Sequence, residues 1–314
     1  MKIIWFSKTP LKLLINKLEV YFMNTLIITS IEQGLIFAVL SMGVFITYKI
    51  LDMPDLTVEG TFPFGAFLFA RFVSLGINPI LSTLMAFVLG TLAGLSTSIL
   101  FTKLKIKPIL AGILTMTILY SVNLKTNGKA NVPLFNYNTV FDKGSKLLIL
   151  IIIVLFIKLI LDLFLKTETG YLLIATGDNE SLVKSLGESS DKYKLLGLML
   201  ANGLVALSGA LMAQYNGFAD ITMGHSIIVV ALASIIIGDT IRKSSTRLKS
   251  TTRVITGAII YRIIGGIAID LGLDPHDLRA VNALIVIIFI SYNNFAVNIF
   301  KNGKKGGEEI AKNN

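Results

Sequence analysis

Long apolar stretches separated by short polar loops make up most of the chain. About 20 consecutive apolar residues are enough for a helix to cross a bilayer, so each such stretch predicts a membrane-spanning helix. Residues 79–101, 195–215 and 280–300 contain no charged residue. Residues 25–48 contain a single Glu, and residues 147–165 contain one Lys and one Asp.

Four shorter apolar runs lie between these spans, and two of them begin at a proline. Segments too short to cross unaided are typical of broken or re-entrant helices that line a polar path. The pattern predicts an all-α integral membrane protein, a polytopic helix bundle of about eight to nine transmembrane segments with broken or re-entrant helices. The shorter runs are residues 63–75, 108–124, 226–238 and 254–269.

Lys and Arg are distributed unevenly between alternate loops, which predicts the orientation. Loops 102–107, 166–194 and 239–253, together with the tail from residue 301, carry 16 of these residues, and the loops between them carry 5. Basic residues accumulate on the cytoplasmic side of membrane proteins. We therefore place loop 166–194 inside and the N-terminus outside.

The N-terminal residues do not fit this orientation, because residues 1–24 carry four lysines. Three interpretations are open: an interfacial amphipathic helix, an extra re-entrant turn, or a true start at Met23. We divide the chain into this basic N-terminal segment, a transmembrane domain over 25–300 with its cytoplasmic loop 166–194, and a disordered cytoplasmic tail over 301–314.

Composition then excludes several functions. Apolar residues make up 54% of the chain and charged residues only 15%, well below the roughly 25% of a soluble domain. The chain has no Cys and only two His, which are far apart, so we expect no catalytic residue, no metal site and no cofactor. The net charge of +10 fits the positive-inside pattern, and we expect no nucleic-acid partner.

Two stretches of the chain resemble one another. Each is an apolar helix rich in small residues, then an Asp-(Leu/Ile)-Thr turn, then a second short apolar segment; the turns are Asp55–Gly60 and Asp220–Gly224. The predicted topology runs the two copies in opposite directions, so the pattern indicates an inverted repeat, as found in transporters. The alternative is a chance match in a sequence rich in Gly and Leu.

Carboxylates next to the spans are candidates for a polar path, because exposing them to lipid costs several kcal/mol. The alternative is that both turns are ordinary loops at the membrane edge, whose Asp and Thr cap the next helix. The candidates for the translocation path are Asp55, Thr57, Glu59, Gly60, Asp220, Thr222 and Gly224.

The inside loop 166–194 predicts a short helix at about 179–186. Thr176 or Asp178 is placed to cap it, Gly187 to end it, and Ser189 or Ser190 to cap the long helix that follows. A rigid helix on the cytoplasmic side has the shape of a docking element. The alternative is a loop helix that only covers the end of the bundle.

These residues resemble a known family. The run ATGDNE followed by LGLMLANGLVALSGALMAQYNGFADITMG is similar to inner-membrane permease subunits of ABC importers, of the branched-chain amino acid and ribose type. The first half agrees, with EQGLIFAVLSMGV and ILDMPDLTVEGTFPFGA, and the resemblance covers roughly residues 30–295. Within the family, the chain is similar to permeases that work with a lipoprotein binding subunit for amino acids, aromatic ones included.

The resemblance implies a binding-protein-dependent import system in the bacterial cell membrane. Its partners would be an ABC ATPase subunit, an extracytoplasmic solute-binding (lipo)protein and a second permease subunit in a homodimer within the lipid bilayer. It also implies that the short inside helix is the coupling helix that seats in the ATPase. The residues that match the family loop are Gly177, Asp178, Asn179, Glu180 and Gly187.

We therefore expect a multi-pass permease that is not itself an enzyme. No G-x-x-x-x-G-K-[ST] motif occurs in the chain, so ATP would be hydrolysed on a separate ATPase chain. The alternative functions are an ion- or proton-coupled secondary transporter, which would share the inverted repeat, and a channel-like or scaffold membrane protein. A capped helix in loop 166–194 favours the importer, because a secondary transporter has no need of one.

Overall fold

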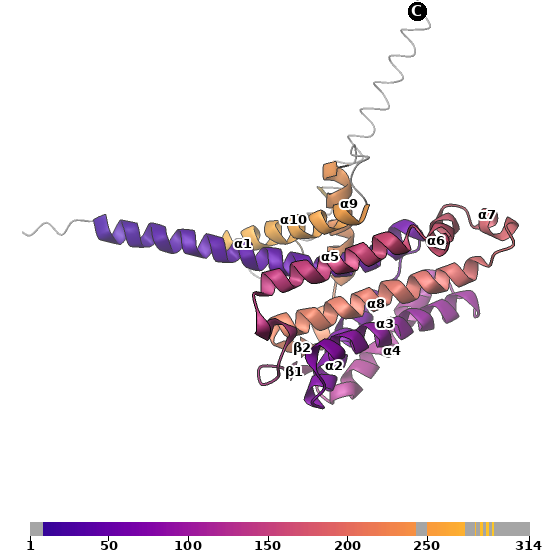
Figure 1. The fold of residues 1–314 in the computed structure, drawn as a ribbon, viewed down its shortest axis with the longest axis horizontal. Helices are drawn as coiled ribbons and strands as arrows, with labels where there is room; N and C mark the ends of the chain where they lie inside the picture. The colour runs from indigo at the N-terminus through magenta and orange to yellow at the C-terminus, as the bar shows by residue number, and fades with distance from the viewer. Residues whose placement is uncertain are drawn as a thin grey trace, which may run out of the picture.

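The computed structural model describes residues 9–242 and 250–273, with six isolated positions between 280 and 291; its side chains are described from residue 25 onward. The described chain is almost entirely helical (Figure 1). Its helices are α1 Thr9–Phe45, η1 Ile46–Ile50 (a π-helix), α2 Val58–Ser74, α3 Pro79–Thr102, α4 Pro108–Asn127, η2 Val140–Lys143, α5 Lys146–Phe164, α6 Glu168–Asp178, α7 Glu180–Ser185, α8 Ser190–Asn216, η3 Ile221–Gly224, α9 Ile227–Arg242 and α10 Ser250–Asp270. Two short strands, β1 Asn131–Pro133 and β2 Phe218–Asp220, complete it.

The predicted polytopic helix bundle is confirmed. Seven helical segments of the described chain are long and apolar enough to cross a membrane. Helix α2 has 17 residues and is shorter than these spans. Most of the predicted span 280–300 and all of the tail 301–314 lie outside the described residues, and the boundary expected at residue 24 falls within α1.

Helix α8 lies at the centre of the bundle, with α3 packed beside it (Figure 1). In its most apolar window 78% of residues are buried, against 33% for α3 and 28% for α5. Helices α1, α2 and α3 all pack against α8. The outer helices therefore separate α8 from the surrounding lipid.

Glycines bring the neighbouring helices unusually close to α8. A Cβ added at Gly65 of α2 would overlap the carbonyl oxygen of Ala206, and one at Gly94 of α3 would overlap that of Leu198. In membranes, where apolar side chains gain nothing by leaving lipid, such close backbone approach is a main source of helix association.

The two similar stretches run in opposite directions in the structure. Helices α1 and α8 are antiparallel: Ser208 donates a hydrogen bond of 2.8 Å to the carbonyl of Ile36, and Gly43, further along α1, faces Ala201, earlier on α8. Each stretch then breaks before the next helix. The first break follows η1 and places Asp52 in the left-handed region at φ 51°, and the second contains β2 and η3.

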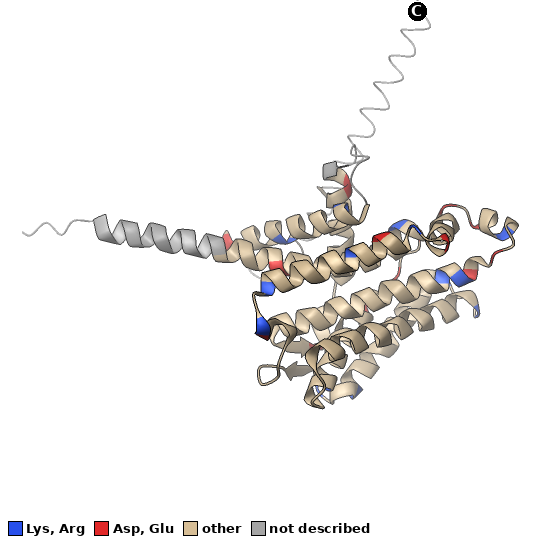
Figure 2. Ribbon diagram, in the orientation of Figure 1, with Lys and Arg blue, Asp and Glu red and all other residues tan. Residues whose placement is uncertain are grey.

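The loops group at two ends as the orientation predicts. At one end β1 pairs antiparallel with β2, which joins the α4–α5 connection to the α8–α9 connection. At the other end Asp239 lies 3.2 Å from Lys49 and 3.6 Å from Arg253. Figure 2 shows charged residues at the end that carries α7, whereas the bodies of α3 and α8 carry almost none.

Replacing Gly65 with Val tests the packing on α8. We expect Gly65→Val to destabilise the fold by about 3 kcal/mol, because the added side chain has no room beside Ala206. The measurement is the thermal midpoint of the purified protein in detergent. Gly265→Ala is the matched control, since a Cβ there meets nothing within 4 Å; equal midpoints for the two variants would contradict the prediction.

Candidate functional site

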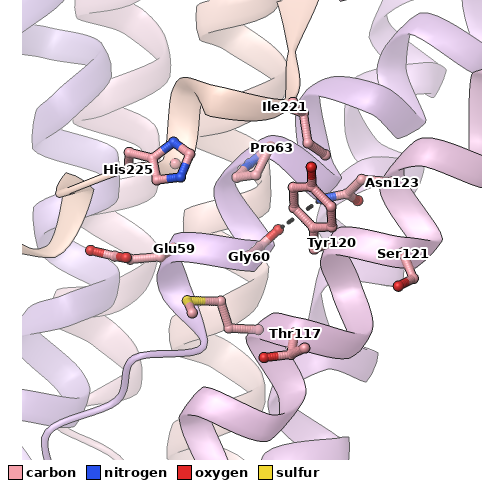
Figure 3. Close-up of a pocket in the computed structure, with 11 residues that line it drawn as sticks. Glu59, Gly60, Pro63, Thr117, Tyr120, Ser121, Asn123, Ile221 and His225 are labelled. Carbon is pink, nitrogen blue, oxygen red and sulfur yellow. Dashed lines mark hydrogen bonds between the residues drawn. The ribbon is translucent and has the colours of Figure 1, made fainter. Parts of the chain in front are cut away.

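A cavity of about 240 Å³ opens between α2, α4 and the η3 turn, where the two similar stretches meet. The meeting point is tight, because a Cβ at Gly224 would overlap the carbonyl oxygen of Glu59. Figure 3 shows Glu59 on α2, Tyr120 on α4 and His225 just after η3 around this space. The cavity is therefore built from both copies of the repeat.

The first acidic turn is buried beside this cavity. Asp55 accepts a hydrogen bond of 2.9 Å from the backbone N–H of Thr57 and one of 2.8 Å from the amide of Asn202 on α8. Asn202 in turn accepts from the hydroxyl of Thr61 at 2.8 Å, and Thr57 shares a hydrogen bond of 2.7 Å with Thr97 of α3. These contacts fix the start of α2 against α8 and α3.

The second acidic turn repeats the same local geometry nearer the outer end. Asp220 accepts from the backbone N–H of Thr222 at 2.7 Å, as Asp55 does from Thr57, and it caps η3. It also accepts from the amide of Asn131 at 2.9 Å. The repeated Asp-(Leu/Ile)-Thr pattern therefore has a structural cause: the Asp carboxylate closes the turn on the N–H two residues later.

The seven predicted path residues fall into three places. Glu59, Gly60 and Gly224 line the cavity. Asp55 and Thr57 are buried among the helices behind it. Asp220 and Thr222 belong to the η3 turn at its outer edge, where capping is their visible contribution.

The sequence prediction missed the wall of the cavity that α4 provides. Thr117, Tyr120, Ser121 and Asn123 line it, and His225 lines it from beyond η3. Asn123 donates a hydrogen bond of 3.3 Å to the carbonyl of Gly60 (Figure 3). The sequence did contain a signal for this wall, namely several polar side chains within the apolar run 108–124. The prediction considered mainly carboxylates and so did not include them.

The inside loop forms two helices, of which only the second was predicted. Helix α7 occupies the expected position, but its cap is Asn179, whose side chain accepts from the N–H of Leu182 at 3.1 Å. The expectation that Thr176 or Asp178 caps it was wrong, because α6 runs through both residues. Gly187 ends the segment at φ 80°, as predicted, and Ser189 precedes α8 without a side-chain cap bond.

Glu180 holds α7 against the start of α8. Its carboxylate accepts from Lys184 and Lys194, each at 2.7 Å, and from the hydroxyl of Ser190 at 2.9 Å. The hydrogen bonds from Lys184 and then Lys194 hold the pKa of Glu180 at about 2, below its usual 4.5. The carboxylate therefore stays charged and paired at any physiological pH.

Helix α6 is in backbone contact with the π-helix that precedes the first break. A Cβ at Gly177 would overlap the carbonyl oxygen of Ile50. Asp178 lies nearby in a cavity of about 390 Å³ that Lys49 and Asp239 also line. The predicted coupling segment thus touches the π-helix through Gly177, and Asp178 shares a cavity with the end of α9.

The α7 segment exposes two leucines beside polar Ser181, Lys184 and Ser185. Leu182 and Leu186 lie four residues apart and are 49% and 63% exposed, whereas Val183 between them is buried. This pair is absent from the sequence prediction, whose residues instead shape and anchor the helix. Among the described residues no three His, Cys, Asp or Glu side chains come together as a group that could hold a metal ion.

Comparisons with known proteins agree with this architecture. A family model described as the permease component of a branched-chain amino acid transport system matches residues 26–291. A tyrosine transport system permease protein of Clostridioides difficile (strain R20291) is 44% identical over 280 residues, which cover 89% of this chain and 95% of that protein. A ribose import permease protein of Bacillus subtilis (strain 168) is 28% identical over 83% of this chain and 79% of its own length.

A solved structure has a similar fold. It is described as PsaBC from Streptococcus pneumoniae in complex with Fab; the TM-score is 0.50 at 16% identity, covering 85% of this chain and 90% of that chain. At this identity the likeness concerns the fold alone.

The pairing of Glu180 predicts a pH dependence for α7. Because the folded-state pKa is lowered, its stabilising effect is present above pH 4.5 and is lost as the pH falls from 4.5 towards 2. A spin label on a Cys introduced at Leu186, in a chain with no other Cys, should stay equally mobile from pH 7 to 5 and become more mobile below 4.5.

The same label tests the carboxylate directly. With Glu180→Gln we expect high mobility already at pH 7. Glu168→Gln is the control, since Glu168 makes no ion pair within the described part of the chain. An unchanged spectrum in Glu180→Gln would show that the pairing does not hold α7.

Two asparagines allow the two acidic turns to be compared. Asn202→Ala removes the amide donor to buried Asp55 and should destabilise the fold by about 2 kcal/mol, because a buried carboxylate loses a partner. Asn131→Ala removes the corresponding donor to partly exposed Asp220 and should cost well under 1 kcal/mol. Thermal midpoints in detergent measure both, and equal losses would contradict the difference in burial.

Proposed function

The chain belongs to the family of permease components of branched-chain amino acid transport systems, and from this premise we propose that it forms the translocation path of an ATP-driven importer. It is a multi-pass protein of the bacterial plasma membrane and a transport permease rather than an enzyme. The proposed solute is an amino acid or a related small compound, which the likeness to a tyrosine transport permease supports.

The observation that carries the ATP-driven role is the α6–α7 unit. Helix α7 is too short to be stable alone, yet a cap, an ion-paired carboxylate and a left-handed glycine hold it in one position. It presents Leu182 and Leu186 away from the bundle. A rigid apolar pair at the cytoplasmic end suits docking into a groove of an ATPase subunit.

We assign two kinds of role within this coupling segment. Gly177, Asp178, Asn179, Glu180 and Gly187 form and anchor the segment. Leu182 and Leu186 supply the docking surface.

A mechanical route connects α7 to the cavity. Helix α6 touches the backbone of Ile50 through Gly177. The break that follows leads directly to Glu59 and Gly60, which line the cavity. Displacement of α6 and α7 by a nucleotide-driven partner would therefore reach the cavity through η1, and would shift the permease between two discrete packings.

The remaining partners follow from the same proposal. A second permease subunit, a copy of this chain, would complete the path, with Glu59, Gly60 and Gly224 lining it and the Asp55 and Asp220 turns shaping it. An extracytoplasmic solute-binding (lipo)protein would dock at the end that carries β1 and β2. ATP would be hydrolysed on the separate ATPase chain.

A pull-down from native membranes tests the docking surface. Tagged full-length protein, purified in mild detergent, should bring down an ATPase subunit identified by mass spectrometry. We expect Leu182→Ala with Leu186→Ala to reduce the recovered ATPase at least tenfold, because the exposed apolar anchors are lost.

The matched control is Leu155→Ala with Leu159→Ala, an exposed pair of the same spacing on α5. It should leave recovery unchanged. Equal recovery from both double variants would contradict the assignment of the docking surface. Failure of wild type to recover any ATPase, under conditions that preserve a known importer, would instead favour an ion- or proton-coupled secondary transporter.

A further inference from the structure

We infer that the cavity between α2, α4 and η3 recognises a primary ammonium group, so that the permease itself favours solutes that carry an amine. The inference rests on the proposed function, since it assumes that the solute passes this cavity. It adds a chemical selectivity within the membrane to whatever selectivity a binding protein supplies.

Asn123 provides the first observation. Its side chain is fully buried, and its amide nitrogen donates to the carbonyl of Gly60. Its amide oxygen, also buried, has no hydrogen-bond partner. Buried acceptors are almost always satisfied in folded proteins, so an unpaired one in the wall of a cavity indicates a missing donor.

Glu59 provides a negative charge in the same wall. Its half-buried carboxylate lies in the first turn of α2, near His225 and the backbone N–H of Ser226. No Lys or Arg is among the residues that line the cavity. Intramembrane carboxylates are normally paired, and beyond the Ser226 N–H and His225 this one has acceptor capacity left for a cation that arrives from outside the protein.

His225 adds another acceptor. Its Nδ1 lies 3.1 Å from the carbonyl oxygen of Thr222, and a carbonyl oxygen only accepts, so Nδ1 carries the proton. In the neutral ring Nε2 is then an acceptor. Tyr120 completes the rim with an aromatic ring that is 50% exposed, a surface over which a cation is attracted.

Together these groups match one ligand chemistry. An alkylammonium has three donors and no acceptor, and the cavity offers a carboxylate, an imidazole nitrogen and an aromatic face, with the unpaired amide oxygen of Asn123 buried in its wall. A carboxylate ligand would find neither Lys nor Arg among the lining residues. The volume of about 240 Å³ is enough for an ammonium and the adjoining carbons of a small solute.

The position of the cavity indicates that it faces a polar path and not lipid. Thr117, Tyr120 and Ser121 are exposed at the middle of the α4 span, whereas the outer face of α5 exposes Leu, Ile and Phe. Polar side chains at this depth are costly against lipid and usually face a polar path. The cavity therefore faces the proposed path.

The test measures binding to the full-length chain in lipid nanodiscs by saturation-transfer-difference NMR. The probes are tyramine, which carries an ammonium, and 4-ethylphenol, which lacks the amine; empty nanodiscs correct for partition into lipid. We expect tyramine to bind wild type at least tenfold more tightly than 4-ethylphenol. Glu59→Gln should weaken tyramine binding at least tenfold and leave the affinity for 4-ethylphenol unchanged.

Asn123→Ala is the second variant and should weaken tyramine binding several-fold, while Glu168→Gln, in α6, should not change it. Equal binding of the two probes to wild type, no binding of tyramine, or unchanged affinity in Glu59→Gln would each overturn the inference. The assay contains no ATPase. If tyramine binds specifically but the pull-down recovers no ATPase, only the proposed importer is rejected. If the pull-down recovers the ATPase but tyramine does not bind, only the ammonium site is rejected.

Discussion

The fold depends on backbone contact along α8. Lipid removes the usual gain from burying apolar side chains, so the helices must associate through close approach and polar contacts. Glycines supply the approach: Gly43 of α1, Gly65 of α2 and Gly94 of α3 each bring their helix against a carbonyl of α8. Because three helices meet the same backbone, the position of α8 determines theirs.

Polar contacts then determine where α2 begins relative to α8. Asn202, in the middle of α8, links Asp55 to Thr61 and so determines where α2 begins after the first break. That start places Glu59 and Gly60 in the cavity wall. This buried network does not contact the solute, but it positions Glu59 and Gly60, which we propose line the path.

The sequence was sufficient for features that depend on composition and local turn chemistry. Long apolar runs predicted the spans, Lys and Arg counts predicted which loops share an end, and Gly187 was placed correctly because few other residues tolerate a left-handed conformation. It was insufficient where partners are distant in the chain. Glu180 is predicted as a contact for the ATPase, but it pairs with Lys194 at the start of α8. The polar residues of α4 form a cavity wall only because η3 lies opposite them.

The central position of α8 has a consequence for biogenesis. Synthesis runs from the N-terminus, so α1, α2 and α3 leave the ribosome long before α8 does. Until then the glycine surfaces at Gly43, Gly65 and Gly94 have no partner and face lipid or one another. A chain truncated before residue 190 would therefore lack the element on which α1, α2 and α3 converge. Helices α2, α3 and α4 can already contact one another, but the packing that joins α1, α2 and α3 through one backbone waits until α8 enters the bilayer.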